Sequence, residues 1–290
     1  MKRKLCKAEA DLRRFCGMRG KGDGEKPPAP SIIAQISPFE KGVPKKRDFC
    51  GNPPLPSLDK QAGKEYNNSI NRKGYTEMNT TILLVRHGES LGNRDELFLG
   101  HTDLPLSELG HRQAAALASA LRGRHIDAVY SSDLSRAMQT VAPAAAERGL
   151  TVTPCRGLRE IFAGDWEGKR YDDLAVLWPS ERGTWKNNIG FACPPNGESV
   201  RELYARVEKT LAEIAAANEG RVVLCGTHAT PVRATTARLL GLGLEAMATV
   251  PWAPNASITT VVFEDGVPTL VGEADASHLE GIATFVPKKI

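Results

Sequence analysis

From Thr81 onward, short segments rich in β-branched residues and leucine alternate with longer segments of helical periodicity, and this alternation constrains the fold most strongly. The segments typical of strands are 81–86, 126–130, 150–155, 221–226, 257–264 and 267–272. The segments typical of helices are 107–122, 133–148, 170–178, 198–217 and 230–241. The pattern predicts a three-layer α/β fold, a mostly parallel sheet with helices on both faces. Asp265-Gly266 indicates that the last two strands form a hairpin at one edge.

The first 77 residues differ in character from the rest. They hold 8 of the 19 prolines and 17 Lys and Arg against 9 Asp and Glu, whereas residues 78–290 hold 21 Lys and Arg against 25 Asp and Glu. No sustained strand or helix period runs through 1–77, and such a segment buries too little apolar surface to offset its chain entropy. The sequence predicts a basic, Pro-rich, disordered extension over 1–77 and one folded domain over 78–290.

Three interpretations of the extension compete: a basic arm for an acidic partner, an organelle transit peptide, or sequence upstream of a true start at Met78. Transit peptides are poor in acidic residues, and an arm for nucleic acid concentrates its Lys and Arg in denser blocks. Met78 lies three residues before the first strand. The upstream interpretation is therefore favoured, a linker without function comes next, and no nucleic-acid partner is expected.

The composition of the whole chain is that of a globular protein without a membrane segment. It is 41% hydrophobic and 25% charged, and no uncharged apolar stretch approaches the ~20 residues that cross a bilayer. The initial MKRK is not followed by the apolar run of a secretory signal. The six cysteines form no C-x-x-C pair, so neither a zinc site nor a disulfide framework is indicated. We expect a cytoplasmic protein with no membrane partner and no metal.

Charged and titratable residues follow three of the predicted strands at the point where each strand ends. The first strand ends on Arg86-His87-Gly88, the second runs into SSDLSRAMQT with Arg136, and the fourth ends in GTHATPVR with His228. Ligands of open α/β sheets bind beyond the carboxyl ends of the strands. Arginine forks and helix N-termini suit phosphate oxygens, so we expect a shared phosphate site at this edge.

His87 is the candidate nucleophile of this site. A neutral imidazole attacks phosphorus readily, and neighbouring arginines hold the pKa of a histidine at or below ~6.5, which leaves a ring nitrogen unprotonated at neutral pH. A single histidine at a strand end is usually structural. The prediction therefore depends on the arginines and on the second histidine.

Several motifs in a fixed order carry a family resemblance. LLVRHGES is followed by SSDLSRAMQT, LREIFAGDWEG and a histidine at a strand end, and over about 81–264 this set resembles the histidine phosphatase superfamily. That superfamily includes phosphoglycerate mutases, α-ribazole phosphatases and broad-specificity phosphatases. The resemblance implies the phosphoglycerate mutase-like fold.

The resemblance also implies a phosphohistidine mechanism. His87 would accept the phosphoryl group, Arg86, Arg136 and His228 would stabilise charge on its oxygens, and water would then release phosphate. Glu160 occupies the position of the family's acid, which protonates the leaving oxygen. The other candidates for this role in the chain are Asp165, Glu167 and Glu89. Asn93 matches a further position near the phosphate. No metal or cofactor is required.

One motif departs from the family pattern, and it bears on the phosphate site. Ala229 and Thr230 stand where many relatives have two glycines. This difference could narrow the pocket or move the amides that line it. The histidine before them, His228, is retained.

The resemblance favours a phosphatase, a hydrolase of phosphomonoesters acting on a small phosphorylated metabolite. The short GDWEGKRYDDL connection and the later PPNGESVRELYARV are more similar to the α-ribazole and broad-specificity phosphatases than to the mutases. A phosphoglycerate mutase and a catalytically silent phosphate-binding protein remain the alternatives. The residues that could cap the pocket are Arg94, Trp166, Arg170, Tyr171, Trp178, Trp185 and Lys186.

Overall fold

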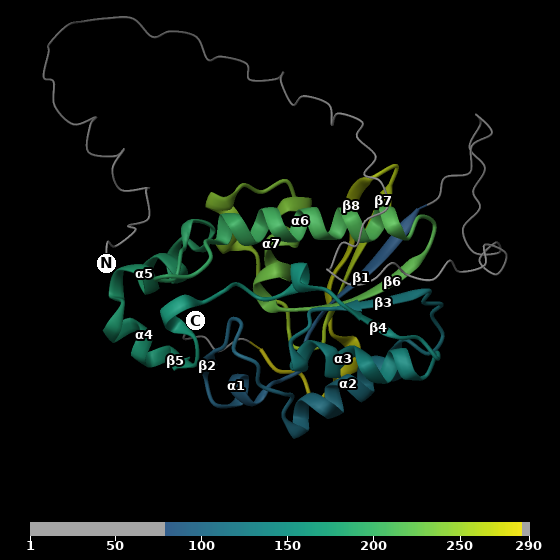
Figure 1. Cartoon of the computed structure of the whole chain (residues 1–290), viewed down its shortest axis with the longest axis horizontal. Coiled ribbons are helices and arrows are strands. Elements are labelled where there is room, and N and C mark those ends of the chain that lie inside the picture. The colour runs from purple at the N-terminus through teal and green to yellow at the C-terminus, as the bar shows by residue number, and fades with distance from the viewer. Residues whose placement is uncertain (1–78, 286–290) are drawn as a thin grey trace, which may run out of the picture. The chain divides into compact units, whose positions relative to one another are not determined.

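The computed structural model describes residues 79–285, so the predicted extension over 1–77 lies outside the described residues. A six-stranded sheet with the order β4-β3-β6-β1-β7-β8 forms its centre (Figure 1). The strands are β1 (Thr80–Arg86), β3 (Ala128–Ser131), β4 (Val152–Pro154), β6 (Val222–Thr227), β7 (Ile258–Glu264) and β8 (Val267–Asp275). The pairs β1–β6, β3–β6 and β3–β4 are parallel. The six predicted strands and the mostly parallel sheet are thus confirmed.

The central strand β1 explains how the sheet separates two cores. Its side chains alternate between the faces: Ile82 and Leu84 pack into one cluster of buried residues, and Leu83 and Val85 pack into the other. All four side chains are fully buried. A strand that is covered on both faces reads as a continuous apolar run, which is why TILLV was recognisable in the sequence.

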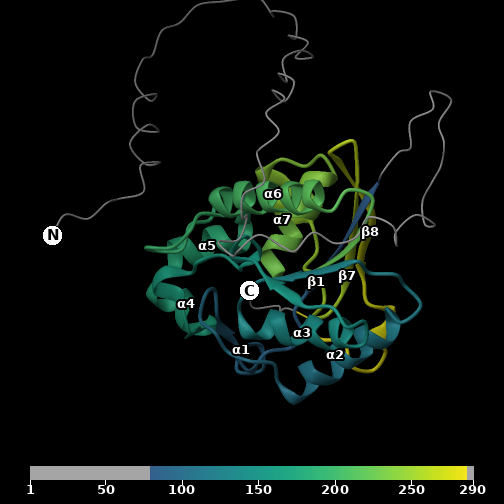
Figure 2. The same ribbon diagram turned by 45° about the vertical axis from the view of Figure 1, so that its right-hand side comes forward.

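Helices cover both faces of the sheet, as predicted. The helices α2 (Glu108–Ala120) and α3 (Ser135–Ala146) lie on one side of the strands, and α6 (Val200–Ala217) and α7 (Ala229–Leu239) lie on the other (Figures 1 and 2). Ser107 begins α2 by accepting a hydrogen bond from the Gly110 amide, and Ser199 begins α6 in a capping box with Glu202.

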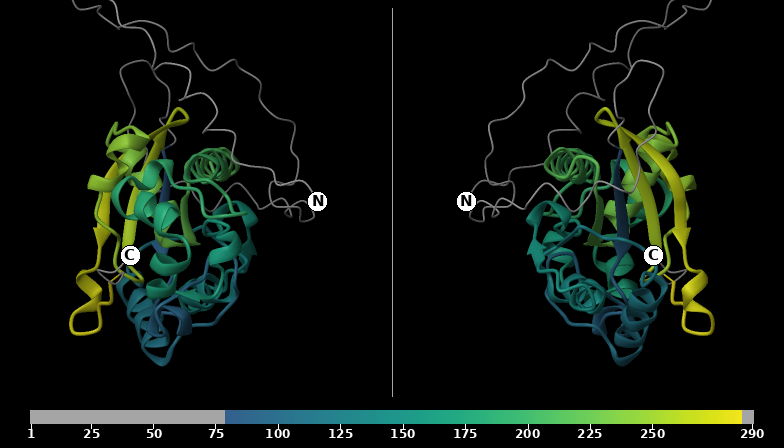
Figure 3. Two further views of the ribbon diagram at one scale, coloured as in Figure 1. Left: turned by 90° about the vertical axis from the view of Figure 1, so that its left-hand side faces the viewer. Right: turned by 90° about the vertical axis from the view of Figure 1, so that its right-hand side faces the viewer.

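The hairpin at the edge of the sheet is also confirmed. Asp265 and Gly266 both have positive φ, 48° and 80°, which is the geometry of a tight hairpin turn between β7 and β8. β7 pairs antiparallel with β1. Figure 3 shows this hairpin, in yellow, along one side of the described residues.

Short elements between the main ones were not predicted. They are the helices α1 (Leu91–Arg94) and α5 (Pro179–Asn187), the strands β2 (Leu97–Phe98) and β5 (Lys169–Arg170), and the 3₁₀ turns η3 (Arg156–Leu158), η4 (Gly164–Trp166), η5 (Ile189–Phe191), η6 (Leu244–Thr249) and η7 (Ser277–Leu279). Apart from α5, these elements have six residues or fewer, which are too few positions to show a period. The helix α5 has nine residues, but Trp185 is its only large apolar side chain. The helix predicted over 170–178 is α4 (Tyr171–Leu177), and Pro179 starts α5 directly after it.

No helix among residues 79–285 is long and apolar enough to cross a membrane.

Candidate active site

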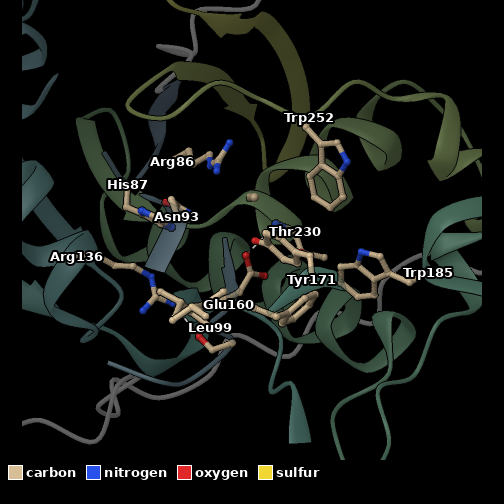
Figure 4. Close-up of a pocket in the computed structure, with 14 residues that line it drawn as sticks. Arg86, His87, Asn93, Leu99, Arg136, Glu160, Tyr171, Trp185, Thr230 and Trp252 are labelled. Atoms are coloured by element: carbon tan, nitrogen blue, oxygen red, sulfur yellow. Dashed lines mark hydrogen bonds between the residues drawn. The ribbon is translucent and has the colours of Figure 1, made fainter. Parts of the chain in front are cut away.

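A cavity of about 60 Å³ lies at the carboxyl ends of the parallel strands, where the sequence placed the phosphate site. Its lining residues are Arg86, His87, Asn93, Leu97, Phe98, Leu99, Gly100, Arg136, Glu160, Tyr171, Trp185, Ala229, Thr230 and Trp252. Figure 4 shows the polar residues Arg86, His87, Asn93 and Arg136 on one side and the aromatic residues on the other. The cavity therefore has a polar end and an aromatic end.

His87 is held with one ring nitrogen available for chemistry. Its backbone amide donates to the carbonyl of Thr227 on β6, at 2.9 Å. Its Nδ1 lies 2.6 Å from the carbonyl oxygen of Gly88. A carbonyl only accepts, so Nδ1 carries the proton and Nε2 keeps its lone pair. Burial, and then the charges of Arg136 and Arg86, lower the pKa of His87 well below its ordinary value, so the ring is neutral at pH 7.

Two buried arginines flank this histidine without an ion pair among residues 79–285. Arg86 donates to the carbonyl of Ala253 at 2.5 Å, and Arg136 donates to the carbonyls of Thr102 and Gly100, each at 2.8 Å. Their Nε atoms are buried and have no partner in the described part of the chain. Burial lowers the pKa of both guanidinium groups to about 10, so both remain cationic at pH 7. Buried cations without an ion pair are costly, and an anion in the cavity would compensate them.

His228 is the second histidine that the structure brings to this place. Its ring centroid lies 5.1 Å from that of His87, although His228 is not part of the cavity wall. Its Nε2 lies 2.8 Å from Oγ of Ser132, which follows β3, and its Nδ1 is buried without a partner among the described residues. Burial and then Arg136 lower the pKa of His228 well below its ordinary value.

Glu160 lies in the cavity wall, on an irregular segment after η3. Its Oε1 accepts from the amide of Ile161 at 2.8 Å, and its Oε2 accepts from the amide of Thr230 at 3.2 Å. Thr230 therefore directs its amide to the candidate acid. Ala229 and Thr230 both line the cavity.

Asn93 reaches the cavity from the short helix α1. Its Oδ1 accepts from the amide of Ser90 at 3.2 Å and from Nδ2 of Asn255 at 3.3 Å, which leaves its own amide group as the end that can donate to a ligand. Asn255 also donates to the carbonyl of His87 at 2.9 Å. Asn255 was not predicted, because it lies in a loop without a recognisable motif.

The aromatic end of the cavity is formed by Tyr171, Trp185 and Trp252. Trp185 and Trp252 are nearly parallel, with centroids 6.4 Å apart and an interplanar angle of 21°. The guanidinium carbon of Arg233 lies 4.2 Å from the centroid of Trp252. This cation–π contact holds the indole against the α7 side of the cavity.

Only part of the predicted cap reaches the cavity. Tyr171 and Trp185 line it, whereas Trp166 is fully buried and packs on Phe98. The remaining candidates, which are absent from the cavity wall, are Arg94, Arg170, Trp178 and Lys186. Trp252 and the segment 97–100 were missed, since neither belongs to a recognised motif.

Glu167 does not face the cavity but orders the loop that holds Arg136. Its carboxylate accepts from the amides of His101 and Thr102, both at 2.7 Å, and from the amide of Ala163 at 3.0 Å. This loop presents the carbonyls that Arg136 binds. Of the competing acids, Glu167 is therefore engaged in structure, while Glu160 faces the cavity.

Comparison with known proteins agrees with this geometry. The family model of the histidine phosphatase superfamily (branch 1) matches residues 82–276. The adenosylcobalamin/alpha-ribazole phosphatase of Escherichia coli is 35% identical over 166 residues, 57% of this chain and 82% of the relative. Phosphoserine phosphatase 1 of Hydrogenobacter thermophilus is 31% identical over 187 residues, 63% of this chain and 87% of the relative. Relatives named as probable phosphoglycerate mutases also match.

A solved structure shows the same fold. Bacillus stearothermophilus YhfR superposes with a TM-score of 0.67 at 28% identity, over 69% of this chain and 99% of that chain. The family match covers most of the residues that form the sheet, including all of the predicted site. The prediction of a phosphatase fits the named phosphatases among the relatives. The chain belongs to the histidine phosphatase superfamily, branch 1.

Proposed function

We propose that the protein hydrolyses small phosphomonoesters through a phosphohistidine on His87. The Nε2 lone pair attacks phosphorus, the bond from phosphorus to the leaving oxygen breaks, and Glu160 gives that oxygen a proton. Water then attacks the phosphohistidine and gives a proton to the Glu160 carboxylate, the phosphorus–nitrogen bond breaks with its electron pair returning to Nε2, and phosphate leaves with neutral His87 and protonated Glu160 restored.

Four side chains support the charge of the phosphoryl oxygens. Arg86 and Arg136 supply guanidinium donors, including the Nε–H groups that have no partner among the described residues. Nδ1–H of His228 donates a further hydrogen bond when its Nε2 accepts from Ser132. Asn93 donates from its amide group. The observation that carries the proposal is the position of His87, with Nδ1 bonded to the Gly88 carbonyl, between two buried arginines that form no ion pair among residues 79–285. Burial and these arginines lower the pKa of His87, which favours its neutral form.

The test is to trap the intermediate. Incubation with a ³²P-labelled aryl phosphate, followed by a rapid quench, should give acid-labile label on His87. His87→Ala should give no label and no turnover, while His111→Ala, in the exposed part of α2, should behave as the parent protein. Label on another residue, or full turnover by His87→Ala, would refute the mechanism. Absence of turnover on any phosphoester would instead favour the silent phosphate-binding alternative.

The substrate class follows from where the cavity places its charges. The cations that line it are Arg86 and Arg136, both at the polar end, whereas Tyr171, Trp185 and Trp252 line the other end. Burial raises the pKa of the Tyr171 hydroxyl to about 12, so this residue is neutral at pH 7. A leaving group with an uncharged ring fits this end, while a carboxylate on the leaving group would find no cation there among the described residues of the wall. The partner is thus a small phosphorylated metabolite.

A phosphoglycerate mutase is the second candidate, because relatives with that name match the chain. A mutase must hold an acidic substrate and shield the phosphoenzyme from water. The test is incubation with 3-phosphoglycerate and a trace of the bisphosphate. Isomerisation faster than phosphate release would establish a mutase. Release of phosphate from aryl phosphates whose aryl group is uncharged, at a rate above that of the isomerisation, supports the phosphatase. A cytoplasmic location stays a prediction from the cysteine pattern.

A further inference from the structure

In the segment that leads to Glu160, the backbone carbonyls accept hydrogen bonds from side chains rather than from a neighbouring strand. The carbonyl of Leu158 accepts from Oγ1 of Thr227 at 2.7 Å. The carbonyls of Gly157, Arg159 and Glu160 all accept from Arg206, at 2.9, 3.0 and 3.2 Å. Carbonyls in such a segment need partners, and one guanidinium on α6 supplies a donor to three of these four.

Arg206 is itself rigidly placed. Its Nε and Nη2 form a bidentate pair with the Glu198 carboxylate, at 2.9 and 2.8 Å. Glu198 also accepts from the amide of Phe162 at 3.2 Å, and its own amide donates to the carbonyl of Phe162 at 2.8 Å. The chain is therefore tied to the start of α6 on both sides of Glu160.

The close approach of this segment to α6 depends on Gly157. A Cβ atom at this position would lie 2.1 Å from Oγ1 of Thr210, one turn beyond Arg206. Oγ1 of Thr210 donates to the carbonyl of Arg206 at 2.7 Å, so this side chain is held in place. The lack of a side chain at residue 157 thus lets the arginine reach the carbonyls directly.

The side chain of Glu160 is aligned by these backbone contacts. His101 adds a second donor to the carbonyl of Glu160, with its Nε2 at 3.0 Å. With its carbonyl fixed from one side, the residue points its carboxyl group into the cavity, where the amides of Ile161 and Thr230 bind it. A general acid acts only when it lies within hydrogen-bond reach of the leaving oxygen, and a small displacement removes most of its effect.

We propose that Arg206 is a positioning residue for the acid of the reaction: through the carbonyls of Gly157, Arg159 and Glu160, it sets where Glu160 delivers its proton. Arg206 is not part of the cavity wall and touches no reacting atom. The inference rests on the proposed role of Glu160 as the acid. Its consequence is specific, because loss of Arg206 should matter only for substrates whose leaving oxygen needs a proton.

The experiment compares two substrates in the full-length protein. In 4-nitrophenyl phosphate the leaving oxygen departs without a proton, whereas in 2-phenylethyl phosphate the departing alkoxide requires one. The variants are Arg206→Met, Arg206→Lys and Glu160→Gln. The matched control is Arg148→Met, because Arg148 also binds three backbone carbonyls, those of Leu121, Arg124 and Ala144, and is not part of the cavity wall. The measured quantity is kcat/KM, which reports the steps up to phosphoryl transfer to His87.

For Arg206→Met we expect kcat/KM with 2-phenylethyl phosphate to fall about 100-fold, and kcat/KM with 4-nitrophenyl phosphate to fall less than about tenfold. Arg206→Lys keeps the charge but not the fork, so it should show the same selectivity with a smaller loss. The control should lose neither activity. A fall that is equal for both substrates in both Arg206 variants, or no fall, overturns the proposal.

Glu160→Gln separates the two ideas that the experiment contains. If Glu160→Gln shows the dependence on the leaving group and the Arg206 variants do not, the positioning role fails while the acid stands. If Glu160→Gln itself shows no such dependence, the assignment of the acid fails. Circular dichroism of each variant identifies any loss of fold, and if Arg206→Met does not fold, Arg206→Lys decides by the same comparison.

Discussion

Replacing Arg136 by Met should remove much of the catalysis while leaving the fold nearly as stable as before. The side chain is 1% exposed, and burial lowers the pKa of its guanidinium to about 10. The difference from the ordinary value of ~12.5 corresponds to roughly 3 kcal/mol by which the folded state disfavours this charge. Because the pKa is lowered in the folded state, this cost is fully present below pH 10 and is relieved only as the pH rises above 10.

The substitution has two opposing effects on stability. It removes the cost of the buried charge, but the carbonyls of Gly100 and Thr102 lose their donor, at about 1–3 kcal/mol each. These contributions nearly cancel, so we expect the free energy of unfolding without ligand to change by less than about 2 kcal/mol. A bound phosphoryl group loses at least one charge-assisted hydrogen bond of about 1.5–3 kcal/mol, which corresponds to a fall in kcat/KM of roughly 10- to 150-fold.

Urea unfolding with and without inorganic phosphate, together with kcat/KM, measures both parts. Phosphate should stabilise the parent protein, and this gain should be much smaller for Arg136→Met, since ligand stabilisation depends on affinity. Arg148→Met is the control for the loss of a carbonyl-binding arginine away from the cavity. Unfolding of Arg136→Met in the absence of urea, or an unchanged gain from phosphate, would show that Arg136 serves the fold and not the anion.

Three further outcomes are expected, two on pH and one on packing. Burial lowers the pKa of His87 and of His228. We therefore expect kcat/KM for an aryl phosphate, corrected for ionisation of the substrate, to show no loss due to these histidines between pH 7 and 6.5. An acid limb centred at or above pH 6.5 would contradict a neutral His87. Because both pKa values are lower in the folded than in the unfolded state, the unfolded chain binds protons at a higher pH. The free energy of unfolding should therefore fall as the pH drops below ~6.5, by up to about 1.4 kcal/mol per pH unit for each histidine. Urea unfolding of the parent protein and of His228→Gln measures this fall. Gly157→Ala should lower the free energy of unfolding by about 1–3 kcal/mol through the contact with Thr210. The same substitution should cost less when it is made in a Thr210→Ala background. Strictly additive effects of the two substitutions would exclude this contact as the cause.

Local patterns in the sequence were enough to predict the sheet, its covering helices and the edge of the sheet where the candidate site lies. Residues 82–85, ILLV, are an uninterrupted apolar run because β1 is buried on both faces, and the helical periodicity of 107–122 and 198–217 matches α2 and α6. Parallel strands bring their carboxyl ends to one edge, so residues that follow β1, β3 and β6 had to meet there. His87, Arg136 and His228 do meet, although they lie far apart in the chain.

The residues that surround them could be identified only from the folded structure. Trp252 and Asn255 lie in a loop without periodicity, and Arg206 lies on a helix whose pattern shows only which face is buried. Their roles arise from contacts across 45 residues or more, such as that between Arg206 and the carbonyl of Glu160. Local patterns record which groups are buried and where the chain turns. Which carbonyl a distant side chain binds depends instead on how the packed layers bring the segments together.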